Sequence, residues 1–213
     1  MCGSDELEVS RSGSGAKCTK CGHVTYPVTS PVGIVSVSDG SGDNLLLIRQ
    51  PRYPPGMYSC IAGFLDAGES LEVSIVINIF SNHFLRFYIL ASIGFLMSVT
   101  ILFQDCVKRE VAEEVGLEVE SVEYKCSQHW PFPSGSLMIG CHSRVSGVTP
   151  DPDPCTLELE DARWFSRDEV QEAVERIDKN PRLRVGRNND PKEIFIAPKG
   201  ALAYSLITKW LEK

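Results

Sequence analysis

Basic residues are scarce in this chain relative to acidic ones. Its 213 residues include 21 Lys and Arg against 28 Asp and Glu, which gives a net charge of −7 at pH 7. Phosphate backbones and anionic lipid surfaces repel such a chain, so generic nucleic-acid or membrane-surface binding is disfavoured. An acidic enzyme that acts on an anionic substrate usually needs a divalent cation between the two, so the charge is compatible with metal chemistry.

The sequence also lacks the cysteine pattern of a secreted, disulfide-rich protein. Of the eight cysteines only Cys18 and Cys21 are close in sequence, and the N-terminus has neither a hydrophobic signal peptide nor an Arg-rich leader. The opening residues resemble the middle of a longer protein. We therefore expect free thiols in a reducing compartment, with the close pair best suited to a metal.

Short apolar runs between turns predict an α/β layered domain. Residues 1–26 form a small N-terminal module with too few apolar residues to build a core unaided. The remainder, 27–213, reads as one domain. Its expected strands cover 32–37, 44–49, 58–64, 119–128 and 136–145, with another ending at 164–165, and its expected helices cover 105–115, 167–177 and 199–213.

The helix expected over 105–115 carries a cluster of carboxylates. Glu110 and Glu114 are four residues apart and share one face, with Glu113 beside them. Like charges at this spacing destabilise a helix, and a hard cation such as Mg²⁺ or Mn²⁺ removes the repulsion. The alternative is a solvated acidic face without a ligand.

The surrounding residues decide between these two interpretations. Residues 63–72 and 105–117, joined directly, read G-x5-E-x7-R-E-U-x-E-E-x-G-U, where U is a bulky aliphatic residue. This pattern resembles the Nudix box of the Nudix hydrolases. The fixed positions are Gly63, Glu69, Arg109, Glu110, Val111, Glu113, Glu114, Gly116 and Leu117.

Membership of that family implies an α/β/α sandwich around a mixed sheet, with Mg²⁺ or Mn²⁺ as the catalytic cation. By the resemblance, Glu110 and Glu114 bind the metal, Glu113 assists the chemistry, and Arg109 holds the carboxylate of Glu69.

The resemblance also implies a further metal ligand six residues before a tryptophan on a late strand. Glu158 stands six residues before Trp164 and fits that position. Glu160 and Asp161 are close enough in sequence to take its place.

A second motif begins ten residues beyond the box, at Ser127-Gln-His-Trp-Pro-Phe-Pro-Ser-Gly-Ser. It is similar to the S-Q-P-W-P-F-P-x-S signature of the NADH pyrophosphatase subfamily, with His129 in place of a proline. Aromatic faces held by prolines can stack on a nicotinamide or adenine ring, and an amide or hydroxyl can bond its edges. The alternative is a Pro-rich turn packed on the core. The implied substrate contacts are Gln128, Trp130, Phe132, Ser134 or Ser136, and Ala203 in the closing helix.

The N-terminal module resembles a degenerate form of the zinc ribbon found in this subfamily. Cys18 and Cys21 match its second knuckle, whereas Cys2 and Asp5 stand where two further cysteines belong. A Cys₃Asp zinc site is chemically feasible but unusual, and two free thiols at Cys18 and Cys21 are the alternative.

A 32-residue insert separates the two halves of the box. Residues 73–104 contain 21 apolar residues and no acidic residue, lysine or proline. We interpret the insert as a retained intron, because a T-rich segment between GT and AG encodes this composition and its removal restores the seven-residue spacing. A membrane span is the alternative, since 87–103 carries no charge over 17 residues.

Two functions remain open for the chain. The first is metal-dependent hydrolysis of the pyrophosphate bond of NADH, NADPH or NAD⁺ to NMN(H) and AMP, or its 2′-phosphorylated form. The second is a catalytically impaired splice variant that binds nucleotides or has no function. The resemblance implies a homodimer in mitochondria, although no transit peptide is visible and a cytoplasmic location is the alternative; no specific nucleic-acid or membrane partner is expected.

Overall fold

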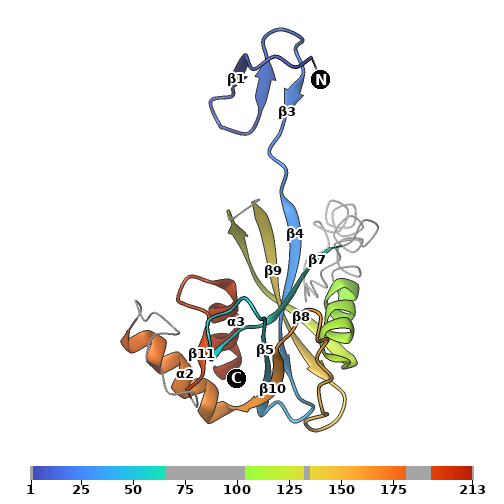
Figure 1. The fold of residues 1–213 in the computed structure, drawn as a ribbon, viewed down its shortest axis with the longest axis vertical. Coiled ribbons are helices and arrows are strands. Elements are labelled where there is room, and N and C mark those ends of the chain that lie inside the picture. Colours follow the sequence, from blue (N-terminus) through green and yellow to red (C-terminus); the bar gives the residue numbers. More distant parts are fainter. Residues whose placement is uncertain (1, 66–103, 132–134, 181–192, 213) are drawn as a thin grey trace, which may run out of the picture.

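The structure is a computed structural model that describes residues 2–65, 104–131, 135–180 and 193–212. Within these residues the chain forms one large mixed sheet flanked by helices and a small N-terminal sheet (Figure 1). The strands of the large sheet are β4 (Ser30–Ser38), β5 (Asn44–Arg49), β7 (Ile61–Phe64), β8 (Val119–Trp130), β9 (Ser136–Val145) and β10 (Asp161–Ser166). The predicted α/β class is therefore confirmed.

The large sheet is ordered β10-β5-β4-β9-β8, with β7 also paired to β4. β4 runs parallel to β9 and antiparallel to β5 and β7. β5 occupies the C-terminal part of β4 and β7 the N-terminal part, so two short strands share one side of a long one. This arrangement places Phe64, the end of β7, beside Val32 near the start of β4.

Helices cover both faces of the sheet. On one face, α2 (Arg167–Lys179) and α3 (Leu202–Leu211) bury a core around Phe165, Leu206 and Ile207. On the other face, the helix over residues 104–115, here called the carboxylate helix, packs through Val107, Val111 and Val115. The sequence repeat of valine every four residues therefore gives the buried stripe that it predicts.

Two element boundaries differ from the sequence-based expectation. The strand expected over 58–64 is divided into β6 (Met57–Tyr58), which pairs in parallel with β11 (Phe195–Ile196), and β7. The closing helix begins at Leu202 instead of 199, because Gly200 has φ of 93° and lies in a turn. Left-handed backbone is incompatible with a continuing helix.

The start of the carboxylate helix also differs from expectation. Asp105 is a natural N-cap residue, and the sequence predicts a helix that restarts at Cys106. In the structure residues 104 and 105 are already helical, so Asp105 is not the cap. No glycine or proline precedes it in the insert sequence at 102–104 to stop the helix from extending backward.

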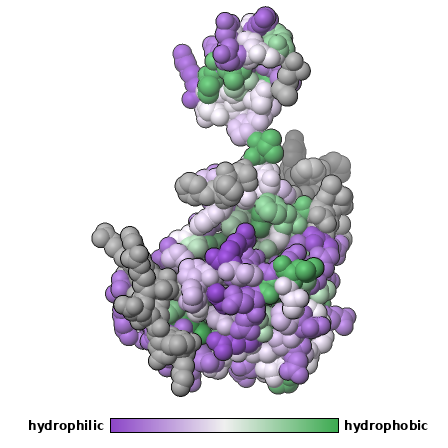
Figure 2. Space-filling view, viewed as in Figure 1, coloured by the Kyte–Doolittle hydropathy of each residue, from purple (hydrophilic) through white to green (hydrophobic). Residues whose placement is uncertain are grey.

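The N-terminal module is a three-stranded antiparallel sheet of β1 (Leu7–Val9), β2 (Ala16–Cys18) and β3 (Val24–Thr25). It lies apart from the main body and is joined to it by one extended segment (Figure 1). Figure 2 shows hydrophobic surface on the module and on that segment. Between residues 2 and 29 only Cys18 is buried, so the module has no hydrophobic core.

The insert lies almost entirely outside the described residues, of which it contributes only Gln104. In the described part of the chain, no helix is long and apolar enough to cross a membrane. The interpretations of the insert as a retained intron or a membrane span therefore stay predictions.

Candidate active site

The strand β7 brings a glycine directly against the carboxylate helix. A Cβ atom built on Gly63 would lie 1.8 Å from Cδ of Glu110 and 2.0 Å from its Oε1. Only a hydrogen atom fits in that space. The first glycine of the motif is therefore needed so that the Glu110 carboxylate can lie over the strand.

Glu114 is a buried carboxylate one helical turn farther along. It is 3% exposed, and its Oε2 has no hydrogen-bond partner in the described part of the chain. Burial first, and then the charges of Glu110 and Glu158, together raise the pKa of Glu114 to about 8. Burial also raises the pKa of Glu110, although Arg109 opposes that shift. A buried carboxylate oxygen without a hydrogen-bond partner, next to a second carboxylate, fits a divalent cation, which carboxylate oxygens bind well.

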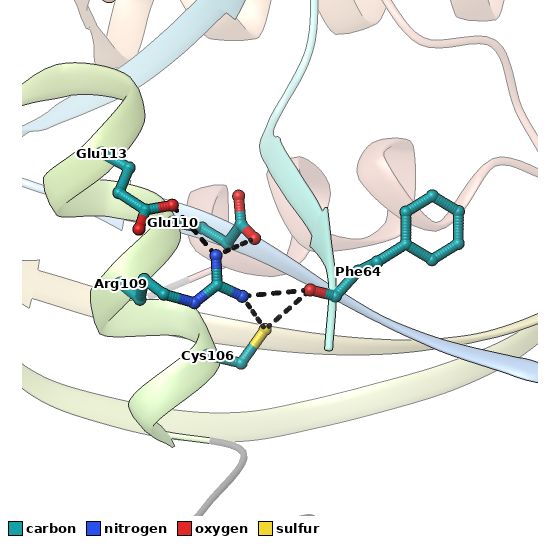
Figure 3. Close-up of polar contacts among 5 residues, drawn as sticks. All are labelled: Phe64, Cys106, Arg109, Glu110 and Glu113. Atoms are coloured by element: carbon teal, nitrogen blue, oxygen red, sulfur yellow. Dashed lines mark hydrogen bonds and ion pairs between the residues drawn. The ribbon is translucent and has the colours of Figure 1, made fainter. Parts of the chain in front are cut away.

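Arg109 fastens the carboxylate helix to β7 (Figure 3). Its Nη1 donates to Oε1 of Glu110 at 2.8 Å and to Oε2 of Glu113 at 3.0 Å, while its Nη2 donates to the carbonyl oxygen of Phe64 at 3.1 Å. The Sγ of Cys106 completes this group at 3.9 Å. One guanidinium thus orients two carboxylates of the helix and holds them at a fixed position relative to β7.

The loop after β9 closes the end of the carboxylate helix. Gly116 takes φ of 68°, which ends the helix in a left-handed cap. The backbone amides of Asp153 and Cys155 then donate to the carbonyl oxygens of Val115 and Glu114 at 2.9 and 2.8 Å. These bonds hold Glu158 near the helix.

The contacts of the three late acidic residues distinguish them. Glu160 forms an ion pair with Arg49 at 3.0 Å, and Asp161 accepts a hydrogen bond from the hydroxyl of Tyr58. Glu158 is exposed, and its charge acts on both Glu110 and Glu114. Of the three, Glu158 is the one whose charge acts on Glu110 and Glu114, and its role as a metal ligand stays a prediction.

Comparison with known proteins identifies the family to which the chain belongs. A profile described as "NUDIX domain" matches residues 102–184. The human protein named "NAD(P)H pyrophosphatase NUDT13, mitochondrial" is 41% identical over 95% of this chain. The chain belongs to the Nudix hydrolase family. A Caenorhabditis elegans protein named "NAD-capped RNA hydrolase ndx-9" is 33% identical over 97% of the chain.

These Nudix relatives are longer than the chain. The matched region spans 47% of both the human and the worm protein, so the chain covers about half the length of the curated relatives it matches. A solved Nudix hydrolase from Clostridium perfringens superposes with a TM-score of 0.49 at 11% identity, over 85% of this chain and 95% of that one. The Nudix profile begins at residue 102, two residues before the last residue of the insert.

The residues predicted to bind substrate fall on one hairpin and the helix beside it. Gln128 and Trp130 lie near the end of β8, and Ser136 faces Trp130 across the β8–β9 ladder. Gln128 donates through Nε2 to the carbonyl oxygen of Gly200 at 2.7 Å, which ties the hairpin to the start of α3. Trp130 is 37% exposed, whereas Ala203 is buried in the core. Phe132, Ser134 and Glu69 lie outside the described residues, so their roles stay predictions.

Tyr53 is a neighbour of the Nudix carboxylates that no motif indicates. It lies in the loop between β5 and β6. Burial raises the pKa of its phenol, the charge of Glu114 raises it too, and a hydrogen bond with Ser59 opposes both. The phenol therefore lies close enough to Glu114 to feel its charge, and it belongs to a loop whose sequence carries no recognisable signal.

The N-terminal module gathers three of its four predicted ligands. The Sγ atoms of Cys2, Cys18 and Cys21 all lie within 4.8 Å of one another, and Asp5 is exposed and outside that group. Hydrogen bonds from the backbone amides of Cys21 and Lys20 lower the pKa of the Cys18 thiol to about 7. A thiol held in this way readily becomes a thiolate.

Substitution of Gly63 tests the contact between β7 and the carboxylate helix. Gly63→Ala should displace the Glu110 carboxylate, because the new methyl group would occupy its position. We expect affinity for Mn²⁺ to fall by roughly 10- to 100-fold, the size of effect that misplacing a metal ligand has. Calorimetric titration of Mn²⁺ measures it.

The matched control for this substitution is a double variant. In a Glu110→Ala background the obstructing carboxyl is gone, so Gly63→Ala should change the free energy of unfolding much less than it does in the parent chain. Equal losses of stability in the two backgrounds would show that the methyl group meets something else.

Proposed function

We propose that this chain hydrolyses the pyrophosphate bond of NADH-type dinucleotides to NMN(H) and AMP, with Mg²⁺ or Mn²⁺ as cofactor. The observation that carries the proposal is the buried carboxylate of Glu114, whose Oε2 has no hydrogen-bond partner in the described residues and on which the charge of Glu110 acts. Because the free energy of burying a lone carboxylate is unfavourable, such a group usually serves a bound cation or a reaction.

The carboxylates divide the work of the proposed site. Glu110, Glu114 and Glu158 hold the cation, which supplies Lewis-acid polarisation of the phosphoryl oxygens when bound. Arg109 keeps Glu110 and Glu113 in a fixed relation to β7. Glu113 is the most exposed of the three glutamates on the helix, with 61% of its side chain accessible, and it can accept a proton from the attacking water.

Trp130 is the residue best placed to recognise a flat ring. It is partly exposed at the end of β8, on the hairpin that also carries Gln128 and Ser136. Trp130→Ala should weaken NADH binding by roughly 1–3 kcal/mol, the range for stacking of a base on an aromatic side chain. Titration of NADH into the variant in the absence of a divalent cation isolates binding from turnover.

Exposed aromatic residues elsewhere give a control for the stacking proposal. Tyr124 lies on the same strand and is 40% exposed, so Tyr124→Ala matches the change in surface without touching the proposed ring site. If Trp130→Ala lowered only the free energy of unfolding and left NADH affinity unchanged, Trp130 would be a packing residue.

Release of AMP from NADH, with and without Mn²⁺, tests the proposed reaction directly. An NAD-capped RNA is the second candidate substrate, because relatives such as the worm protein carry that activity in their names. Parallel assays with NADH, NADPH, NAD⁺ and a capped oligonucleotide rank the substrates. A mitochondrial location is part of the proposal, since two relatives are named as mitochondrial. A homodimer stays a prediction that sedimentation checks.

A further inference from the structure

Arg49 is a buried arginine whose side chain bonds two separate segments of the chain. It is the last residue of β5, and its side chain is only 10% exposed. Its Nη1 donates to the carbonyl oxygens of Tyr53 and Pro54 at 3.1 and 2.5 Å. Its Nη2 forms an ion pair with Oε2 of Glu160 at 3.0 Å. One guanidinium therefore joins the loop after β5 to the residues just before β10.

The loop after β5 carries Tyr53, whose phenol lies close enough to Glu114 to feel its charge. The loop closes back on its own strand, because the backbones of Ser59 and Ile48 exchange two hydrogen bonds, both of 2.9 Å. The two carbonyl bonds from Arg49 hold the part of the loop that lies between these ends. The backbone of Tyr53 is therefore tied to the guanidinium directly.

The second segment carries Glu158, whose charge acts on Glu114. It is attached on both sides of Glu158. On one side, the amide of Cys155 donates to the carbonyl oxygen of Glu114 on the carboxylate helix at 2.8 Å. On the other side, Glu160 bonds Arg49 through its carboxylate and also through its amide, which donates to the Arg49 carbonyl oxygen at 2.8 Å. The position of Glu158 depends on both attachments.

The three acceptors around the side chain of Arg49 suit a guanidinium. Its N–H donors are held in a rigid planar fork, whereas the ammonium of lysine is a compact charge at the end of a flexible stem. A buried cation is unfavourable unless it is paired and hydrogen-bonded, and two carbonyls and one carboxylate meet that need here. A lysine at this position would lose the planar geometry that serves both segments together.

We propose that Arg49 is a positioning residue of the Nudix site, which ties the segment of Glu158 to the loop of Tyr53 and so places Glu158 beside Glu114. The inference rests on the proposed function, in which Glu158 is the third metal ligand. A guanidinium has no acceptor atom, so Arg49 cannot bind the cation itself. Its effect reaches the metal through Glu158, as outer partners of metal ligands act in general.

Calorimetric titration of Mn²⁺ into the metal-free full chain, without NADH, tests this role. Arg49→Met keeps a long side chain and removes all three side-chain bonds, and we expect Mn²⁺ affinity to fall by roughly 10- to 100-fold. Removal of a positive charge alone would raise the affinity for a cation. A fall therefore reports lost positioning, and an unchanged or raised affinity would overturn the proposal.

Arg167→Met is the matched control, because Arg167 also donates to two backbone carbonyls, those of Trp210 and Leu211, at 3.4 and 2.9 Å. We expect it to lower the Tm and to leave Mn²⁺ affinity unchanged. Equal losses of affinity in the two variants would show a general effect of destabilisation, and the proposal would be wrong. Arg49→Lys, which keeps the charge but not the fork, takes the place of Arg49→Met if that variant does not fold.

A double-mutant cycle with Glu158→Gln tests the route of the effect. In that background the ligand that Arg49 positions is already lost, so Arg49→Met should change Mn²⁺ affinity by less than about 3-fold. Additive losses, or an unchanged affinity in Glu158→Gln alone, would show that Arg49 does not act through Glu158. AMP release from NADH is measured on the parent chain separately. A parent that binds Mn²⁺ without turnover contradicts the proposed function, whereas an additive cycle in an active parent contradicts only this inference.

Discussion

Glu114→Gln is expected to abolish turnover while making the metal-free protein more stable. The substitution removes one charge from the proposed cation site, and we expect a loss of more than about 100-fold in kcat/KM. At the same time it removes the charge of a buried carboxylate whose Oε2 has no hydrogen-bond partner in the described residues. Activity and stability should therefore change in opposite directions, which loss of folding cannot produce.

The pH dependence of stability follows from the raised pKa of Glu114. The pKa rises from its ordinary 4.5 in the unfolded chain to about 8 in the folded one, so the folded state binds the proton more tightly. The favourable contribution is fully present below pH 4.5 and is lost as the pH rises through about 8. At pH 7 the penalty is on the order of 3 kcal/mol, which the glutamine variant avoids apart from the unmet hydrogen bonds of its amide.

Thermal unfolding of the metal-free proteins between pH 5 and pH 8 measures this effect. The Tm of the parent chain should fall over that range relative to Glu114→Gln. Mg²⁺ at about 100 times its Kd should stabilise the parent by roughly 3 kcal/mol and the variant hardly at all. Glu120→Gln, an exposed glutamate of β8, is the control for the loss of one charge. Unchanged activity with normal Mg²⁺ dependence in Glu114→Gln would refute the assignment.

Deletion of residues 73–104 is expected to raise activity by about 100-fold or more. The deletion joins Glu72 to Asp105 and restores seven residues between Glu69 and Arg109. In the insert-bearing chain, 39 residues separate Glu69 from Arg109, so the short connection no longer fixes the distance between their side chains. A displacement of about 1 Å at a catalytic group can lower the rate on the order of 100-fold. The insert also adds an apolar segment that favours aggregation.

Metal binding should change much less than activity in the same deletion. Gly63 already contacts Glu110, and Arg109 already bonds the Phe64 carbonyl, in the chain that carries the insert. These contacts position two of the three glutamates of the carboxylate helix without help from the intervening residues. We therefore expect Mn²⁺ affinities within a few-fold of each other, measured by calorimetry beside AMP release.

The outcome also separates the two functional interpretations. If the insert-bearing chain were soluble, monodisperse and as active as the deletion variant, the proposed impairment would be wrong. If it bound Mn²⁺ and NADH without turnover, it would be a nucleotide-binding form of the enzyme. Alignment of the transcript with the genome tests the retained-intron hypothesis separately.

The sequence alone predicted the α/β class and most elements, because their patterns are local. In the carboxylate helix, valine at every fourth position predicts the face that is buried. In β4 and β5, continuous apolar runs predict buried strands. The helix end was also readable, since a glycine at residue 116 is the usual residue for a left-handed cap. The carboxylate spacing on one helical turn likewise follows from the sequence.

Only the tertiary structure decided which partners these residues have. Gly63 and Glu110 are distant in the chain, and they meet because the carboxylate helix and β7 contribute to the same buried cluster. One partner of Arg109 is the backbone carbonyl of Phe64, and a carbonyl has no sequence signature. Glu160 forms an ion pair with Arg49 of β5, whereas the charge of Glu158 acts on Glu110 and Glu114. Local sequence patterns therefore predict the helices and strands and the functional groups that they carry. The contacts between those groups depend on long-range packing, which the sequence patterns do not specify.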